Sequence, residues 1–284
     1  MAANPDLVST EWLEDHLSAP DLVVVDASWY LPTQNRDAKA EYAAGHIPGA
    51  VHLDIDEVSD HDDPLPHMLP RPEPFARAVG ALGIGDGMRM VVYDGLGLFS
   101  APRVWWMLRA FGARDVAVLE GGAPKWRAEG RPWTDEPTRR RPATFTPRFD
   151  HGAVASREDI ARMLASGSHQ VVDARAADRF RGDAPEPRPG LKAGHMPGSL
   201  NVPWSEVQSN GTLRAPDEIR AAFAKAGVDL QRPIVTTCGS GVSAAILTLA
   251  LNSAGVPTRT VYDGSWAEWG GRDDCPVATG DARR

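Results

Sequence analysis

The chain has 284 residues, of which 42% are hydrophobic and 24% are charged, and its formal net charge is −8. This length corresponds to about two domains, and the composition is that of a folded globular protein rather than a disordered one. The acidic excess argues against nucleic acid or an anionic membrane as a partner, and no apolar run is long enough to cross a bilayer. The first residues show no signal peptide, and two cysteines are too few for a disulfide framework, so we expect a cytoplasmic protein.

The first half of the chain predicts short buried strands that alternate with helices. In chain order the elements are a helix, a strand ending in Asp26, a helix near 72–82, a strand at 90–94, a helix at 101–111 and a strand at 116–119. Apolar strands of this length, separated by helices, are typical of a parallel sheet covered by helices on both faces. Residues 1–134 are therefore predicted to form one α/β domain.

An irregular segment, residues 135–152, separates this domain from a second series of elements. It contains three prolines and the basic run Arg139–Arg141 without periodicity, which predicts a linker whose arginines face solvent. The same pattern then returns over residues 153–284, which we take as the second domain. Its elements are a helix with a capping box at Ser156 and Asp159, a strand ending in Asp173, a helix near 216–226, a strand at 234–238, a helix at 243–254 and a strand at 259–262.

Motifs recur in the same order in the two halves, so the chain is a tandem duplication. The strand-end acids Asp26 and Asp173 are each followed by a His-x-Pro-Gly motif, at His46 and at His195. Residues kept in both copies are expected to serve the fold, whereas a chemical group present in one copy is a candidate for function. The residues assigned to the fold are these four, together with Trp126 and Trp269.

The copies differ at the turn that follows the strands at 90–94 and 234–238. The first copy has Asp94 there, and the second has Cys238 at the start of a Gly-x-Gly turn that leads into a helix. Ligands of α/β sheets bind beyond the carboxyl ends of the strands. Backbone N–H groups of such a turn bind anions and stabilise a thiolate, so we predict that Cys238 is a nucleophile. Cys275 has no comparable setting.

The loop from Cys238 to Ala244, Cys-Gly-Ser-Gly-Val-Ser-Ala, resembles the active-site loop of rhodanese-type sulfurtransferases. The members that use 3-mercaptopyruvate have the same loop with Thr at the position of Ser243, whereas thiosulfate-preferring members carry basic residues at the positions of Gly239 and Ser240. Other stretches that are similar to the family are Asp26–Pro32, His67–Pro70, Ser100–Leu108 and Tyr262–Trp266. The resemblance implies two tandem rhodanese-like domains, each a mainly parallel sheet flanked by helices on both faces, the first lacking the catalytic cysteine.

The resemblance also implies a reaction in the cleft between the domains. Cys238 attacks the sulfur of 3-mercaptopyruvate, releases pyruvate and holds the sulfur as a persulfide, which a thiol such as thioredoxin or a small thiol, or cyanide in vitro, removes. A Ser–His–Asp set handles the proton in this family, and its members match Ser240, His67 and Asp56 here. His67 could instead cap the domain interface, and Asp56 could be a turn residue.

The substrate is an anion and requires local positive charge in an acidic protein. Arg179 and Arg188 match the family arginines that hold its carboxylate and keto oxygen, and guanidinium groups suit carboxylates. Arg175, after the strand-end acid, is expected to form a structural ion pair, and Arg181 to face solvent. The remaining predicted binding residues are those of the loop: Gly239, Gly241, Val242 and Ser243.

Three other functions share this fold. A thiosulfate sulfurtransferase would use the same persulfide with another donor, and a non-catalytic rhodanese module would usually lack the cysteine. A phosphatase of this fold needs an arginine six residues after the cysteine, where this chain has Ala244. We find no metal-ligand spacing and no nucleotide-binding loop, so no metal or cofactor is expected, and a monomer suffices for the reaction.

Overall fold

The computed structural model describes residues 6–282, which form two compact units. The N-terminal unit comprises the described residues through 61 together with 69–150 and 210–212. The C-terminal unit comprises residues 62–68, 151–209 and 213 onward. Each unit therefore includes a short segment from the other half of the sequence.

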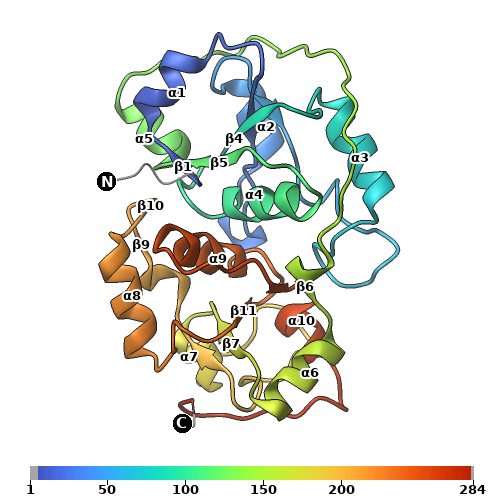
Figure 1. The fold of residues 1–284 in the computed structure, drawn as a ribbon, viewed down its shortest axis with the longest axis vertical. Helices are drawn as coiled ribbons and strands as arrows, with labels where there is room; N and C mark the ends of the chain where they lie inside the picture. The colour runs from blue at the N-terminus through green and yellow to red at the C-terminus, as the bar shows by residue number, and fades with distance from the viewer. Residues whose placement is uncertain (1–5, 283–284) are drawn as a thin grey trace. The chain divides into compact units, whose positions relative to one another are not determined.

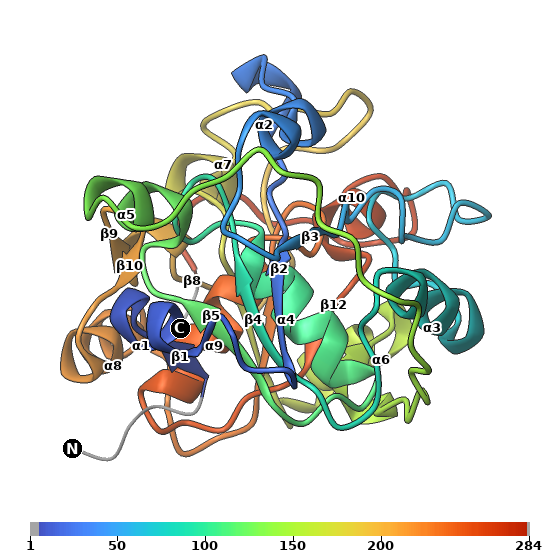
Figure 2. The same ribbon diagram turned by 90° about the horizontal axis from the view of Figure 1, so that it is seen from above.

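The N-terminal unit is built on a five-stranded sheet in the order β1-β5-β4-β2-β3, and every pairing in it is parallel. Figure 2 shows β2 near the middle of this sheet, between β4 and β3. The strands are β1 (Leu7–Val8), β2 (Leu22–Asp26), β3 (Val51–His52), β4 (Arg89–Tyr93) and β5 (Val116–Leu119). All five residues of β2 are buried, which is why this strand reads as a continuous apolar run rather than an alternating one.

Helices cover this sheet on both faces, with α1 and α5 on one face and α4 on the other (Figure 1). The helices are α1 (Thr10–His16), α2 (Ala38–Ala44), α3 (Pro72–Ala81), α4 (Ala101–Ala110) and α5 (Gly122–Ala128), with a 3-10 turn η1 at Pro32–Gln34. Leu13 of α1 and Trp126 of α5 pack with strand residues in one core cluster. Prolines in the first turns of α3 and α4 suit the helix start, where no N–H donor is needed.

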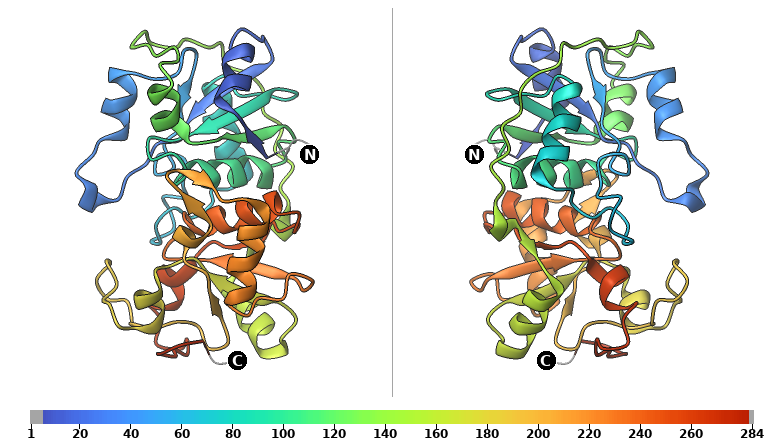
Figure 3. Two further views of the ribbon diagram at one scale, coloured as in Figure 1. Left: turned by 90° about the vertical axis from the view of Figure 1, so that its left-hand side faces the viewer. Right: turned by 90° about the vertical axis from the view of Figure 1, so that its right-hand side faces the viewer.

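The segment after α5 runs in irregular conformation along the N-terminal unit, as the right view of Figure 3 shows in light green. Backbone bonds hold it there: Ala143 N–H donates to Gly80 O over 2.9 Å, and Arg148 N–H donates to Phe111 O over 2.8 Å. The absence of regular structure agrees with the lack of periodicity in the sequence.

The C-terminal unit repeats the architecture with a sheet in the order β6-β12-β11-β7-β8, again parallel throughout. Its strands are β6 (Val154–Ala155), β7 (Gln170–Asp173), β8 (Leu200–Asn201), β11 (Ile234–Thr237) and β12 (Val261–Tyr262). Its helices are α6 (Arg157–Ser166), α7 (Ala177–Arg181), α8 (Pro216–Lys225), α9 (Ala244–Ser253) and α10 (Ser265–Trp269). The unit also contains the 3-10 turns η2 (His151–Ala153) and η3 (Trp204–Glu206) and the short strand β9 (Gln208–Ser209). The short strand β10 (Thr212–Leu213) begins at the last residue of the segment 210–212.

The predicted elements and the observed ones agree to within a few residues. The helix predicted near 72–82 is α3, the strand at 116–119 is β5, and the capping box at Ser156 is present. The strand expected at 259–262 is shorter, since only Val261–Tyr262 pair with neighbours.

The duplicated histidines and tryptophans make the same contacts in both units. His46 Nδ1 lies 2.8 Å from Tyr42 O, and His195 Nδ1 lies 2.8 Å from Phe180 O; each ring also stacks on the aromatic ring of that partner residue. The indoles of the two tryptophans donate to the carbonyl groups of prolines six or seven residues later, Trp126 to Pro132 and Trp269 to Pro276. These residues serve the fold.

Within residues 6–282, no helix is long and apolar enough to span a membrane. No group of three or more His, Cys, Asp or Glu side chains in the same residues could hold a metal ion.

Candidate active site

The loop that follows β11 is hydrogen-bonded to the start of α10. The N–H of Cys238 donates to Ser265 Oγ over 3.2 Å, Trp266 N–H donates to Cys238 O over 2.9 Å, and Ala267 N–H donates to Gly239 O over 2.9 Å. Gly241 has φ +78°, a left-handed conformation that favours glycine. Cys238 is 2% exposed, so its thiol lies at the base of the turn rather than on the surface.

The equivalent turn of the N-terminal unit shows what such a loop can bind. Asp94 follows β4 as Cys238 follows β11, and its carboxylate accepts three backbone N–H groups. Those of Leu96, Phe99 and Ala101 donate to it over 2.9, 2.7 and 2.8 Å. Burial raises the pKa of Asp94, although these three donors favour its charged form. This turn is therefore an anion cradle that carries its own anion.

In the C-terminal unit the corresponding donors face no carboxylate. Ala244 begins α9 as Ala101 begins α4, which makes Ser240, Val242 and Ala244 the equivalent N–H donors. Within residues 6–282, none of these three N–H groups has a protein acceptor. The dipole of α9 also favours an anion at the start of the helix, and its first turn contains no acidic side chain that would supply one. The loop is suited to hold a negatively charged group next to Cys238.

Arg179, from α7, lies against this loop. A Cβ atom placed on Gly239 would lie 3.2 Å from Arg179 Nη2, so the glycine leaves room for the guanidinium. Arg179 Nη2 also lies 2.5 Å from Glu186 Oε2. The structure thus places this predicted substrate-binding arginine beside the cysteine loop.

Glu186 was not among the predicted site residues. Its carboxylate is 1% exposed and bridges two arginines, since Oε1 lies 2.8 Å from Arg175 Nη1. Arg175 in turn pairs with Asp173 at 2.6 Å, which confirms its predicted structural ion pair. A carboxylate in the Pro-Glu-Pro-Arg-Pro run, close in sequence to several arginines, was the signal that could have identified Glu186. Arg181 is partly exposed and pairs with Asp183 on the surface.

Two predicted site residues far apart in sequence meet in the C-terminal unit. His67 belongs to the segment 62–68 of that unit, and its Nε2 lies 3.5 Å from Arg188 Nη2. The imidazole is 7% exposed, and the His67 backbone has φ +60°. A left-handed backbone at a non-glycine residue requires support from its surroundings.

The other predicted residues are placed as follows. Asp56 lies in the N-terminal unit, where Trp29 Nε1 donates to its carboxylate over 2.7 Å. Ser240 and Val242 are buried in the loop, and Ser243 precedes α9. Cys275 packs with Trp269 in the core cluster of the C-terminal unit.

Comparisons with known proteins agree on the family. The Rhodanese-like domain model matches the chain twice, over residues 9–129 and 156–272. The chain is 45% identical over 271 residues to 3-mercaptopyruvate sulfurtransferase of Escherichia coli, covering 95% of this chain and 96% of the relative. It is 46% identical to the human protein of that name, covering 93% and 91%. It is also 45% identical to bovine thiosulfate sulfurtransferase, covering 93% and 91%.

A solved structure supports the same assignment. The crystal structure of SseA from Escherichia coli, which has the rhodanese fold, superimposes with a TM-score of 0.85 at 42% identity. The match covers 92% of this chain and 99% of that one.

Proposed function

The chain belongs to the rhodanese family of sulfurtransferases, and on that basis we propose that it transfers the sulfur of 3-mercaptopyruvate, through a persulfide on Cys238, to a thiol acceptor. The observation that carries this proposal is the pair of equivalent turns. Where the N-terminal unit fills its cradle with the Asp94 carboxylate, the C-terminal unit has a thiol and three N–H groups without a protein acceptor in the described chain.

The first step forms the persulfide. The Cys238 thiolate attacks the sulfur of 3-mercaptopyruvate, an S–S bond forms, and the bond between that sulfur and C3 breaks. The electron pair of this bond passes into the carbonyl as the enolate of pyruvate, which then takes up a proton. The N–H groups of Ser240, Val242 and Ala244 stabilise first the thiolate and then the terminal sulfur of the persulfide.

Positive charge beside the loop binds the donor. Arg179 is next to Gly239, and Arg188 reaches the same unit's His67; together they hold the carboxylate and the keto oxygen of 3-mercaptopyruvate. Glu186 fixes the position of Arg179 through its 2.5 Å contact. The loop residues Gly239, Gly241, Val242 and Ser243 complete the binding site.

The proton for the enolate comes from a set of three polar residues. We assign its transfer to His67, whose ring is buried and next to Arg188, with Ser240 in the loop and Asp56 as the third member. In the second step a thiol such as thioredoxin or a small thiol, or cyanide in vitro, attacks the terminal sulfur and restores the Cys238 thiolate. Both cysteines are free thiols, which suits a reducing compartment such as the cytoplasm.

Thiosulfate is the second candidate donor. Bovine thiosulfate sulfurtransferase has the same identity to this chain, 45%, as the Escherichia coli relative. The residues after Cys238 favour 3-mercaptopyruvate, because Gly239 and Ser240 carry no positive charge for a dianionic inorganic donor.

Intact-mass analysis tests the proposal. The purified protein is incubated with 3-mercaptopyruvate or with thiosulfate, the donor is removed, and the Cys238 peptide is examined for the mass of one added sulfur. We expect the adduct with 3-mercaptopyruvate, with pyruvate released in equal amount. Cys238→Ser is expected to abolish both, and Cys275→Ser to leave both unchanged. An adduct formed only from thiosulfate would overturn the donor, and no adduct from either would overturn the reaction.

A further inference from the structure

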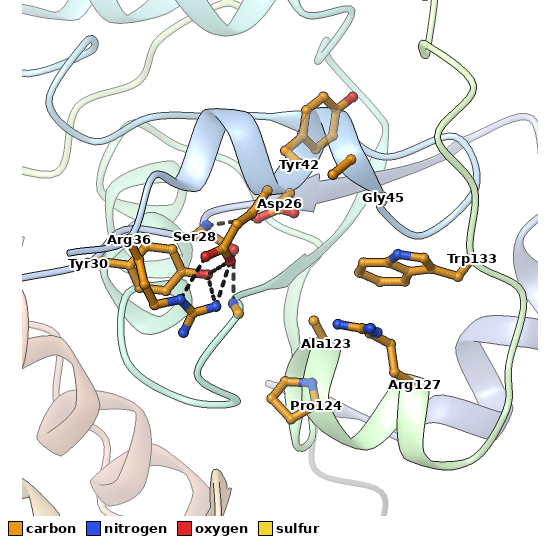
Figure 4. Close-up of a pocket in the computed structure, with 13 residues that line it drawn as sticks. Asp26, Ser28, Tyr30, Arg36, Tyr42, Gly45, Ala123, Pro124, Arg127 and Trp133 are labelled. Atoms are coloured by element: carbon orange, nitrogen blue, oxygen red, sulfur yellow. Dashed lines mark hydrogen bonds and ion pairs between the residues drawn. The ribbon is translucent and has the colours of Figure 1, made fainter. Parts of the chain in front are cut away.

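The N-terminal unit contains a cavity of its own beside the turn of Asp94. Its volume is 480 Å³, within the range of sites that bind small molecules. Figure 4 shows the side chains around it: Tyr30 and Arg36 on one side, Trp133 and Arg127 on the other, and Asp26 at the end of β2. None of these residues has a role in the proposed sulfur transfer.

The duplication explains why this cavity exists. Ser28 stands two residues after the strand-end acid, where the C-terminal unit has Arg175, and Ala123 is the second residue of α5, where α10 has Trp266. Arg175 and Trp266 are fully buried, with Arg175 Cζ 4.3 Å from the centroid of the indole. The small side chains of Ser28 and Ala123 line the cavity instead of filling it.

Two of the four charges around the cavity neutralise each other. Arg36 Nε and Nη2 lie 2.8 and 2.6 Å from the Glu41 carboxylate, and the Tyr30 hydroxyl donates to the same carboxylate over 2.8 Å. Burial and the neighbouring Glu41 raise the pKa of Tyr30, so its hydroxyl stays protonated. This wall therefore presents no net charge.

The other two charges have opposite signs and different positions. Arg127 extends from α5 beneath the Trp133 ring, with Cζ 5.4 Å from its centroid, while the Asp26 carboxylate lies at the end of β2 (Figure 4). Asp26 is 3% exposed and accepts the N–H of Ser28 over 2.9 Å, and it also accepts a hydrogen bond from the Tyr93 hydroxyl. Among the residues that the structure describes, neither Arg127 nor Asp26 forms a salt bridge, although Arg127 is close enough to Glu41 to help lower the pKa of that carboxyl group. A ligand that satisfies both must carry a negative and a positive group.

We propose that this cavity binds a free amino acid with an apolar side chain. Its carboxylate pairs with the Arg127 guanidinium, which offers parallel donors for two oxygens, and its ammonium group pairs with Asp26. The side chain then packs on the apolar surfaces of Tyr42, Ala123 and Trp133, which line the cavity. This binding is independent of the sulfur-transfer reaction.

Calorimetric titration of the full chain tests the proposal, with L-phenylalanine and L-leucine as probes. We expect saturable binding of at least one of them. Two analogues of phenylalanine, 3-phenylpropanoate without the ammonium group and phenethylamine without the carboxylate, should each bind at least about tenfold more weakly.

Matched variants locate the binding. Arg127→Gln removes an exposed charge that faces the cavity, and it should raise the Kd of the bound amino acid at least about tenfold. Lys125→Gln removes a charge from the same helix that does not line the cavity, and it should leave the Kd unchanged. The proposal is overturned if neither amino acid binds, if 3-phenylpropanoate binds as tightly as phenylalanine, or if binding persists in Arg127→Gln.

Discussion

Single side chains distinguish the two otherwise similar turns of this protein. Asp94 supplies its own carboxylate to three N–H groups, and Cys238 leaves the equivalent donors of its turn to another anion. Among the arginines, Arg175 is fully buried and pairs with the carboxylates of Asp173 and Glu186, and Arg188 Nη2 lies 3.5 Å from the His67 imidazole. Complete burial rather than pairing marks Arg175 as structural, because Arg179 also pairs with Glu186 but keeps a 26% exposed side chain beside the cysteine loop.

Arg188→Gln tests the donor-binding role at the residue scale. The substitution removes a group that can pair with the carboxylate of 3-mercaptopyruvate, so we expect KM for this donor to rise at least about tenfold, with a much smaller change for thiosulfate. Steady-state rates with both donors measure this difference. Equal effects on the two donors would remove Arg188 as a determinant of specificity. Arg181→Gln, which changes a partly exposed arginine of the same region, is the control.

His195 predicts a pH dependence of stability. Burial lowers the pKa of this imidazole below its value in the unfolded chain, so the folded protein binds fewer protons there. Its contribution to the free energy of unfolding is complete above about pH 6.5 and is lost as the pH falls from there toward the folded pKa. Urea unfolding at pH 7.5 and 5.5 should show this decrease, and His195→Asn should reduce it. The same decrease in His195→Asn as in the parent would contradict the assignment; His169→Gln, at a partly exposed site, serves as control.

At the scale of elements, the site is a junction of one strand, one turn and two helices. Cys238 directly follows β11, and the chain turns at Gly241 before α9, whose first residue carries the last N–H donor. The start of α10 holds the turn through hydrogen bonds to the carbonyl groups of Cys238 and Gly239. The left-handed conformation at Gly241 sets the direction of the N–H groups that follow it.

Gly241→Ala tests whether the conformation of Gly241 orients the N–H groups of the turn or affects only the stability of the fold. A side chain at φ +78° costs about 1–2 kcal/mol and shifts the turn, so we expect that loss of stability together with at least about tenfold slower persulfide formation. Gly167→Ala is the matched control, since Gly167 has φ +65°, ends α6 and has nothing within 4 Å of an added Cβ. It should lose similar stability and keep its rate. Rapid-quench mass analysis and urea unfolding supply the two measurements, and an unchanged rate in Gly241→Ala would refute the role of the turn.

At the scale of the whole molecule, each unit is completed by a segment from the other half of the sequence. Residues 62–68, which carry His67, belong to the C-terminal unit, and residues 210–212 belong to the N-terminal one. The segment 210–212 packs closely on the turn that contains Gly97, because a Cβ atom on Gly97 would lie 2.8 Å from Gly211 Cα. The domain boundaries drawn at residues 134 and 153 remain a prediction.

This exchange predicts that the second half of the chain is not sufficient for turnover. A fragment of residues 151–284 retains all strands of its sheet but lacks His67. We expect the fragment to show native-like far-UV circular dichroism and to release pyruvate at least about 100-fold more slowly than the full chain, the effect of losing a general acid–base group. His67→Gln in the full chain should cause a comparable loss. A folded fragment with full turnover would show that the segment 62–68 is dispensable.

The duplication, the α/β class and the cysteine turn are all predictable from the amino-acid sequence, because they depend on local signals. Apolar runs, glycines in turns and repeated motifs act over a few residues and are legible without coordinates. The contacts between distant side chains required the folded structure: His67 lies beside Arg188, Glu186 bridges two arginines, and a cavity lies beside the turn of Asp94. Contacts between residues distant in sequence depend on how helices and loops pack on the sheet. Whether a cavity is open or filled depends on the side-chain volumes of several elements at once.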